Sequence, residues 1–298
     1  MTTVSVIIPT YNRASMLAEA LESALRQTLL PDEIVVVDDG STDNTAQVVA
    51  GFGARVRSIH QKNAGPSAAR NHGIATATGD FVAFLDSDDL WPKDRLERQL
   101  AALGKCPELD LIFGLEEKFT EARQFERCEI RDREVLRTLT ATDCIVPDPL
   151  ALLLRENFIP TSSVLFRRQC LAKVGMIDES LHQAEDYDFW FRFALQHCVF
   201  GFCNAALCYR RQHSGNLVNQ FVNRTVSTIE VLKRYQNHSV AHKDRLALRL
   251  SDLHYDLGSH LFYKRDFPRA RQFLSLARPS GPRRVVRATK VALAHLLG

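Results

Sequence analysis

Two carboxylates, Asp86 and Asp88, follow directly on an apolar run at residues 81–85 and are separated by Ser87. Such a run, stopped by Asp and Ser, is typical of a buried strand. Because side chains alternate along an extended backbone, we expect Asp86 and Asp88 to project to one side and Ser87 to the other. Carboxylates that converge at a strand end repel each other unless a cation lies between them, which indicates a divalent-metal site. A plain turn, in which Asp and Ser are common, explains the same residues without any function.

A second acidic group, Glu185, Asp186 and Asp188, opens a segment at 184–193 whose apolar positions fit a buried helix. Acidic residues in a first helical turn interact favourably with the helix dipole and need no further role. The pattern alone therefore assigns them no chemistry.

The first hundred residues alternate between strand-like and helix-like segments. Apolar runs of strand length lie at 4–8, 34–37, 56–59 and 81–85, and helical periodicity marks 14–27, 45–50 and 67–77. This alternation predicts a parallel sheet with crossover helices, whose ligand crevice lies beyond the carboxyl ends of the strands. Polar, turn-forming residues follow three of these strands: Thr10-Tyr11-Asn12, Asp38-Asp39-Gly40 and Asp86-Ser87-Asp88.

Three polar strand ends at one crevice favour a nucleotide pocket. Tyr11 could stack on a base, and Asp39 could accept a hydrogen bond from a ring N–H or a ribose hydroxyl. The chain has neither the Gly-x-Gly-x-x-Gly of a dinucleotide site after its first strand nor a P-loop, so a metal held by carboxylates would neutralise the phosphates. Taken singly, Tyr11 could equally be an aromatic residue at the rim of the core, and Asp39 part of an ordinary turn.

Composition narrows the class of protein. A chain of 298 residues with 45% apolar composition can bury a large core, and its net charge of +3 is too small to indicate a nucleic-acid partner. Its seven cysteines include no Cys-x2-Cys pair, and we expect Cys198, Cys203 and Cys208 to be reduced core residues. Without a signal-like N-terminus or an apolar run of spanning length, we expect a cytosolic protein or one peripheral to a membrane.

Four segments carry a family resemblance: residues 4–13, 35–43, 63–73 and 79–89. They resemble family 2 glycosyltransferases of the GT-A fold, closely over residues 4–96 and more loosely to about residue 213. The resemblance implies an α/β fold with a mixed, mostly parallel sheet flanked by helices, followed here by a helical C-terminal extension. It also implies a nucleotide diphosphate sugar as donor, a divalent Mn or Mg ion, and inversion at the sugar carbon.

The same resemblance suggests roles for individual residues. Tyr11 and Asp39 would hold the base of the nucleotide sugar, and Arg70 would lie near the nucleotide or its diphosphate. Asp86 would reach the ribose and the metal, and Asp88 would coordinate the metal. The rest of the donor site would comprise Pro9, Thr10, Asn12 and Ser87.

The resemblance also covers the acceptor side of the site. Asp186 would be the general base on the acceptor hydroxyl, and Glu185 is the runner-up as base or acceptor-binding group. His213, which follows Tyr209-Arg210, would complete the metal site or contact the phosphate, and Arg210 or Arg211 could balance phosphate charge. A helix N-terminus lowers a carboxylate's pKa, whereas a base near neutrality benefits from a raised one.

We expect two domains, a catalytic one at 1–215 and a helical extension at 216–298. The first would comprise a nucleotide-binding half (1–100) and an acceptor half (101–215), with a strand at 161–166 and a short helix at 167–174. Residues 253–277 resemble one helix pair of a tetratricopeptide-like unit. The basic, amphipathic stretch at 282–293 is typical of a helix on an anionic membrane surface, and equally of a charged terminal helix packed on its own domain.

These features predict a metal-dependent inverting glycosyltransferase at the cytosolic face. It would move a sugar to a hydroxyl of a glycan or lipid-linked acceptor, and the resemblance suggests bacterial surface polysaccharide synthesis. One alternative is transfer to a polyprenyl phosphate, which needs no strong base because that acceptor is already anionic. Another is a non-catalytic nucleotide-sugar-binding or scaffold protein. The nucleotide base, the sugar and the acceptor stay open.

Overall fold

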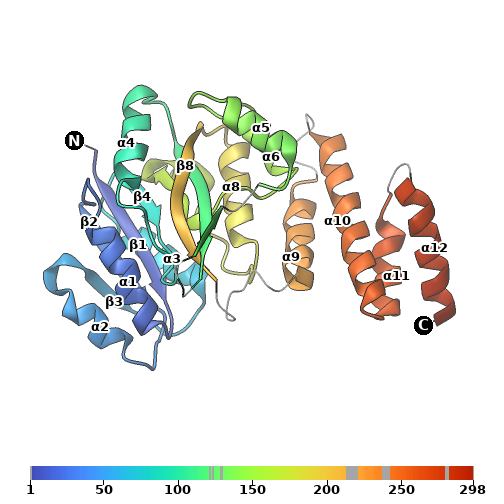
Figure 1. Ribbon diagram of the computed structural model, residues 1–298, viewed down its shortest axis with the longest axis horizontal. Helices are drawn as coiled ribbons and strands as arrows, with labels where there is room; N and C mark the ends of the chain where they lie inside the picture. Colours follow the sequence, from blue (N-terminus) through green and yellow to red (C-terminus); the bar gives the residue numbers. More distant parts are fainter. Residues whose placement is uncertain are drawn as a thin grey trace. The chain divides into compact units, whose positions relative to one another are not determined.

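The computed structural model describes residues 2–120, 122, 124–127, 130–212, 221–236, 242–278 and 282–297. It divides into two compact units, Met1–Asn216 and Leu217–Gly298 (Figure 1). The first unit contains a sheet with helices on its faces, and the second is built from helices α9–α12.

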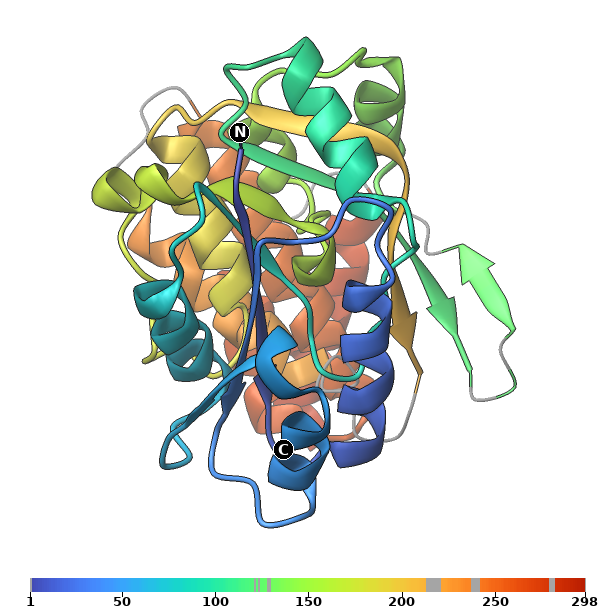
Figure 2. The ribbon, with the colours of Figure 1, turned by 90° about the vertical axis from the view of Figure 1, so that its left-hand side faces the viewer.

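Eight strands form one sheet in the first unit, in the order β3-β2-β1-β4-β7-β5-β6, with β8 paired to β5. The strands are β1 (Val4–Thr10), β2 (Glu33–Asp38), β3 (Arg57–His60), β4 (Phe81–Phe84), β5 (Leu111–Phe119), β6 (Phe125–Arg127), β7 (Leu165–Arg167) and β8 (Phe200–Arg211). Strands β1–β4 run parallel, whereas β7 is antiparallel to both β4 and β5. This arrangement confirms the mixed sheet expected from the sequence (Figure 2).

Helices cover both faces of the sheet. They are α1 (Ala14–Leu25), α2 (Thr45–Gly51), α3 (Pro66–Thr76), α4 (Arg95–Lys105), α5 (Arg133–Ala141), α6 (Pro149–Leu153), α7 (Leu171–Val174) and α8 (Glu185–Leu195). Along β2 the side chains alternate between the faces, so Val36 packs in the cluster that contains Leu17 of α1, while Val35 packs against Ala69 of α3. Burial on both faces explains the unbroken apolar run of this strand.

A glycine sets the position of α3. A Cβ on Gly73 would clash with Ile7 of β1, so glycine lets the helix approach the sheet closely. The same helix carries Arg70, whose side chain is therefore held close above the sheet.

The sequence prediction of a strand over 161–166 is wrong in its first half. Thr161–Ser163 forms a 3-10 turn, and β7 begins at Leu165. Local hydrogen bonds favour the turn, because both the backbone N–H and the hydroxyl of Ser163 donate to the Pro160 carbonyl, at 2.9 and 2.8 Å.

The second unit comprises α9 (Phe221–Arg234), α10 (Lys243–Tyr263), α11 (Phe267–Leu276) and α12 (Pro282–Leu297). The helix pair expected over 253–277 is present as the end of α10 and α11. Gly258 permits their close approach, since a Cβ there would lie 2.7 Å from Leu274 Cγ. Within the described part of the chain, no helix combines the length and the apolar character needed to cross a bilayer.

Candidate functional site

Polar residues from three strands meet at one edge of the sheet, because β1 lies between β2 and β4 and runs parallel to both. Thr10 ends β1 opposite Asp38 of β2, and Asp86 follows the end of β4. Pro9 and Thr10 are buried within β1, and Ser87 is buried in the turn after β4. The three polar strand ends therefore meet at one edge of the sheet, as the sequence predicts. The residues at this edge differ in the hydrogen bonds that they already make within the protein.

Tyr11 and Asn12, just after β1, have different surroundings. The Tyr11 side chain is 48% exposed, so its ring is available for stacking. Asn12 has a left-handed backbone (φ 51°), and its Oδ1 accepts hydrogen bonds from the backbone N–H groups of Thr42 and Asp43 at 2.7 and 3.3 Å. Asn12 therefore holds the loop after β2 in place.

Asp39 is held by three donors. Its Oδ1 accepts from Gln61 Nε2 at 2.7 Å and from the Ala64 N–H at 2.9 Å, and its Oδ2 accepts from the Gly65 N–H at 2.8 Å. A carboxylate has about four acceptor positions, so one remains for a ligand. Asp39 is thus a fixed, largely buried carboxylate with one acceptor position that these donors do not use.

Asp86 and Asp88 lie in a turn, which corrects the expectation of an extended backbone through Asp88. Strand β4 ends at Phe84, and the Asp89 N–H donates to the Asp86 carbonyl at 2.9 Å. Each carboxylate has an arginine partner: Arg70 lies 2.7 Å from Asp86 Oδ1, and Arg13 lies 3.1 Å from Asp88 Oδ2. The segment is a turn and also brings two carboxylates together. The plain-turn interpretation and the metal-site interpretation therefore do not exclude each other.

A third carboxylate, Asp89, is buried beneath this turn. Burial and the nearby Asp86 and Asp88 raise its pKa well above the usual range. The Ser162 hydroxyl donates to Asp89 Oδ2 at 2.7 Å and accepts from the Asp86 N–H at 3.1 Å, while the Ser162 carbonyl accepts from Trp91 Nε1 at 2.9 Å. This network attaches the acidic turn to the 3-10 turn that precedes β7.

Arg70 connects the acidic turn at Asp86 to the start of α8. Its side chain is 7% exposed, and besides Asp86 it contacts Glu185 Oε1 at 3.2 Å. Burial works against the charge of Arg70, but Asp86 and Glu185 together raise its pKa. Burial and the neighbouring Asp186 raise the pKa of Glu185 to about 7, although Arg70 acts in the opposite direction.

Asp186 lies next to this contact, and its Oδ2 makes longer hydrogen bonds than its Oδ1. Its Oδ2 accepts from Asn157 Nδ2 and from the Thr161 hydroxyl, each at 3.3 Å, and its Oδ1 accepts from the Tyr187 N–H at 2.6 Å. Burial raises the pKa of Asp186 despite these hydrogen bonds and Arg70. Burial therefore raises the pKa of both acidic residues, which is the direction that favours proton uptake by a base.

The sequence matches the profile of Glycosyl transferase family 2 over residues 5–159, more than half of the chain. The chain belongs to this glycosyltransferase family. The glycosyltransferase is 32% identical over 226 residues to the uncharacterized glycosyltransferase RT0329 of Rickettsia typhi, covering 74% of this chain and 67% of that protein. An uncharacterized glycosyltransferase of Rickettsia felis is 35% identical over 214 residues, which cover 71% of this chain and 34% of that protein.

Two solved structures share the fold of this family 2 glycosyltransferase. The S. aureus TarS fragment 1–349 in complex with UDP-GlcNAc matches with a TM-score of 0.70 at 21% identity, covering 93% of this chain and 82% of that chain. The mannosyltransferase PcManGT from Pyrobaculum calidifontis, in complex with GDP-Man and Mn2+, matches with a TM-score of 0.66 at 22% identity, covering 99% and 81%. At these identities the likeness shows the fold, which is GT-A.

The residues of the glycosyltransferase fit a hard divalent cation at the acidic turn. Asp86 and Asp88 offer the oxygen ligands that Mg2+ and Mn2+ prefer, and the arginine now paired with each carboxylate supplies charge compensation that a bound cation would replace. The expected third ligand, His213, lies outside the described residues. Arg210 and Arg211 contact protein carboxylates, Glu116 at 2.8 Å and Glu19 at 3.2 Å.

Four contact residues of the glycosyltransferase site escaped the sequence analysis: Arg13, Asn157, Thr161 and Ser162. Arg13 belongs to the first segment that carries the family resemblance, residues 4–13, so its charge was a usable signal. Thr161 and Ser162 lie in the turn that resembled a strand, and Asn157 lies shortly before it. No local pattern there indicates that these residues contact Asp89 and Asp186.

Proposed function

We propose that this glycosyltransferase is a metal-dependent inverting enzyme that moves a sugar from a nucleoside diphosphate donor to a hydroxyl of a glycan or lipid-linked acceptor. The observation that carries this proposal is the contact of Arg70 with both Asp86 and Glu185. It brings a donor-side carboxylate and a base-side carboxylate to one arginine, although they lie far apart in the sequence.

On the donor side, Tyr11 would stack on the nucleotide base. Asp39 would accept a hydrogen bond from a ring N–H of that base, through the one acceptor position that its three protein donors leave unused. The two solved neighbours bind UDP-GlcNAc and GDP-Man, and these ligands support a nucleotide sugar in the same part of the fold. The base of the donor for this chain stays open.

Asp86 and Asp88 would hold Mn2+ or Mg2+, with His213 as a further ligand. When bound, such an ion stabilises the negative charge that develops on the leaving diphosphate. Arg70 and Arg13 would then be available to contact phosphate oxygens, because the cation takes over part of their charge compensation at the two aspartates.

On the acceptor side, Asp186 would take the proton of the attacking hydroxyl as the new glycosidic bond forms. Its Oδ2 is oriented by Asn157 and Thr161. Glu185 is the second candidate, since its pKa of about 7 also suits a base, but its contact with Arg70 ties it to the donor edge.

We also propose that the reaction takes place at the inner face of the membrane, in surface polysaccharide synthesis, and that α12 contacts the lipid. Val285, Val286, Leu293 and Leu296 of α12 are exposed. Several basic groups of the helix instead have partners within their own unit, such as Arg287 Nε, which donates to the Leu274 carbonyl at 2.7 Å. An apolar outer face favours interfacial binding by insertion.

Vesicle sedimentation tests the membrane contact. We expect Leu293→Asp with Leu296→Asp to abolish binding to anionic vesicles, while Arg284→Gln weakens it slightly. Equal binding of wild type and the double variant would exclude the α12 contact and leave the enzymatic proposal intact.

A thermal-shift panel of nucleoside diphosphates and sugar donors, with and without Mn2+, tests the function. We expect one nucleotide to raise the melting temperature in the presence of Mn2+, and Asp88→Asn to remove the Mn2+-dependent part. No shift with any nucleoside diphosphate, or a shift that Mn2+ and Asp88→Asn leave unchanged, would contradict the proposal.

A further inference from the structure

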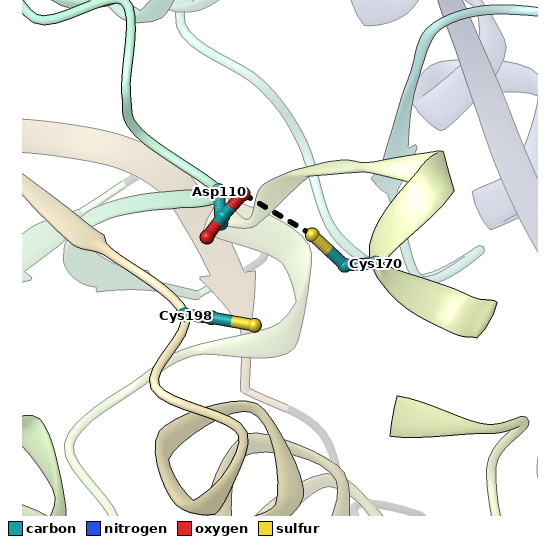
Figure 3. A group of neighbouring side chains, drawn as sticks. All are labelled: Asp110, Cys170 and Cys198. Atoms are coloured by element: carbon teal, nitrogen blue, oxygen red, sulfur yellow. Dashed lines mark hydrogen bonds between the residues drawn. The ribbon is translucent and has the colours of Figure 1, made fainter. Parts of the chain in front are cut away.

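Three side chains that can bind metal lie together away from the site described above: Asp110, Cys170 and Cys198. One ligand atom from each lies within 4.8 Å of the others, and Figure 3 shows the Cys170 sulfur directed toward the Asp110 carboxylate with the Cys198 sulfur beside them. Asp110 immediately precedes β5, Cys170 ends the turn before α7, and Cys198 lies between α8 and β8. The chain thus brings together a carboxylate and two thiols from three separate segments.

This cluster lies at the opposite edge of the sheet from the acidic turn. Strand β7 is antiparallel to β4, with Arg167 opposite Phe81 at the start of β4, whereas Asp86 follows the end of β4. Cys170 comes shortly after Arg167 in the chain. Arg167 also forms an ion pair with Asp110, with its Nε 3.9 Å from Asp110 Oδ1. The cluster is therefore separate from the proposed catalytic metal site.

The spacing of the three groups suits a tetrahedral ion. The Cys170 Sγ–H donates to Asp110 Oδ1 at 3.3 Å. Around a tetrahedral Zn2+, bonds of about 2.3 Å to sulfur and about 2.0 Å to oxygen place S and O about 3.5 Å apart and the two sulfurs about 3.8 Å apart. Since no two of the ligand atoms lie more than 4.8 Å apart, closure around an ion needs the separations to shorten by no more than about 1.3 Å.

The surroundings of the cluster resemble a second coordination shell. Asp110 Oδ2 accepts the Val199 N–H at 3.0 Å, which fixes the carboxylate and leaves Oδ1 directed at the thiols. Two thiolates and one carboxylate around a divalent ion carry one net negative charge, and Arg167 and Lys173 lie close enough to balance it. The cysteines are buried, whereas 16% of the Asp110 side chain is exposed and provides a route for a hydrated ion.

We propose that Asp110, Cys170 and Cys198 bind Zn2+, with a water molecule in the fourth position. Two thiolates with a carboxylate form a borderline-soft ligand set, which favours zinc over the hard ions expected at the acidic turn. On binding, the two thiols release their protons to solvent and two metal–sulfur bonds form, with no change of oxidation state.

A zinc ion here would stabilise the acceptor half. Helix α8 begins with Glu185 and Asp186 at the catalytic edge and ends at Leu195, shortly before Cys198. The ion would therefore join the far end of this helix to the start of β5 and to the turn before α7. We expect it to raise stability without taking part in the sugar transfer.

Cobalt titration of the reduced, chelator-treated full chain tests the proposal. We expect a thiolate-to-Co2+ charge-transfer band that saturates at one equivalent and disappears when Zn2+ is added, since carboxylates alone give no such band. Cys170→Ser with Cys198→Ser should abolish it, and Cys208→Ala, which removes a buried thiol elsewhere, should retain it. Absence of the band in the wild-type chain, or its persistence in the double variant, would overturn the proposal.

Alkylation provides a measurement that does not depend on a folded variant. Zinc should protect Cys170 and Cys198 of the wild-type chain from iodoacetamide at least tenfold, as read by peptide mass spectrometry, and leave Cys106 and Cys203 unaffected. Equal alkylation with and without zinc would contradict the site. If Cys170 and Cys198 are found as a disulfide, the absence of zinc binding after its reduction would also contradict the site.

Discussion

The donor and acceptor sides of the proposed catalytic edge hold their carboxylates in different ways. On the donor side, Asp39 receives three hydrogen bonds of 2.7 to 2.9 Å, two of them from backbone N–H groups. On the acceptor side, Asp186 receives two hydrogen bonds of 3.3 Å from side chains at Oδ2 and one of 2.6 Å from the adjacent Tyr187 N–H at Oδ1. Burial raises the pKa of both Asp186 and Glu185. The Asp39 carboxylate is fixed mainly by backbone donors, whereas burial makes the ionisation of Asp186 and Glu185 costly.

This difference separates two tasks. Binding a nucleotide requires acceptors at fixed positions, which backbone donors provide at little conformational cost. Taking a proton requires a carboxylate with affinity for it, which burial provides. Substitutions on the two sides should therefore affect different measurements.

The largest effect should come from Asp186→Asn. We expect kcat for a hydroxyl acceptor to fall roughly 10³-fold, with the affinity for the nucleoside diphosphate unchanged, because the amide cannot accept the proton. Steady-state kinetics and donor titration check this, with the exposed Asp143→Asn as control. Turnover near the wild-type value would favour an acceptor that is already anionic, such as a polyprenyl phosphate.

Arg70→Gln should disturb both sides at once. Removing this buried guanidinium leaves Asp86 and Glu185 without their shared partner, so we expect a loss of about 4 kcal/mol in the free energy of unfolding. Urea denaturation measures it. The matched control is Arg98→Gln, which breaks an exposed pair with Asp94 and should cost about 0.5 kcal/mol or less. Similar losses for the two variants would show that Arg70 does not connect the two sides.

Glu185→Gln tests the free-energy cost of ionising a buried carboxylate on the acceptor side. Because the pKa of Glu185 is raised from 4.5 to about 7 on folding, its contribution to stability is fully present below pH 4.5 and is lost as the pH rises through about 7. Glutamine resembles the protonated form, so the variant should be more stable than wild type by roughly 3 kcal/mol at about pH 8 and equal to it at about pH 4.5.

Denaturation at the two pH values checks this, with the exposed Glu22→Gln as control. A variant that is less stable than wild type at both pH values would refute the raised pKa.

Asp39→Asn should give the smallest of these effects on stability. The amide group would face the Ala64 or Gly65 N–H with a donor in place of an acceptor, so we expect a loss of about 2 kcal/mol. Donor affinity should fall in parallel, as thermal shift and nucleotide titration would show. Asp80→Asn, at an exposed contact with Thr3, should change neither. Unchanged donor affinity in Asp39→Asn would show that the nucleotide base does not contact Asp39.

The donor side could be predicted from sequence because its geometry follows from local rules. Parallel strands end at one edge of a sheet, so polar residues after β1, β2 and β4 had to meet there. The exception is Asn12, which binds the loop after β2. An asparagine beside a possible ligand gives no sign in the sequence of which partner it takes.

The acceptor side could not be predicted to the same depth. Ser162 contacts Asp89 across 73 positions of the chain, from a turn that resembled a strand. The Cys170 and Asp110 pair, 60 positions apart, has none of the short spacing by which zinc sites are recognised. Both contacts depend on how β7 returns antiparallel to β4, which no local pattern specifies.

The indole of Trp91 gives this enzyme an internal optical probe. The chain has two tryptophans, and Trp190 lies fully buried among the aromatic side chains of α8. Trp91 donates to Ser162, whose hydroxyl contacts Asp86 and Asp89, and the Arg95 guanidinium lies 3.6 Å from its ring centroid. A change at the acidic turn thus reaches a fluorophore through two hydrogen bonds. In Trp190→Phe, the emission of one ring reports events at the catalytic edge without any label.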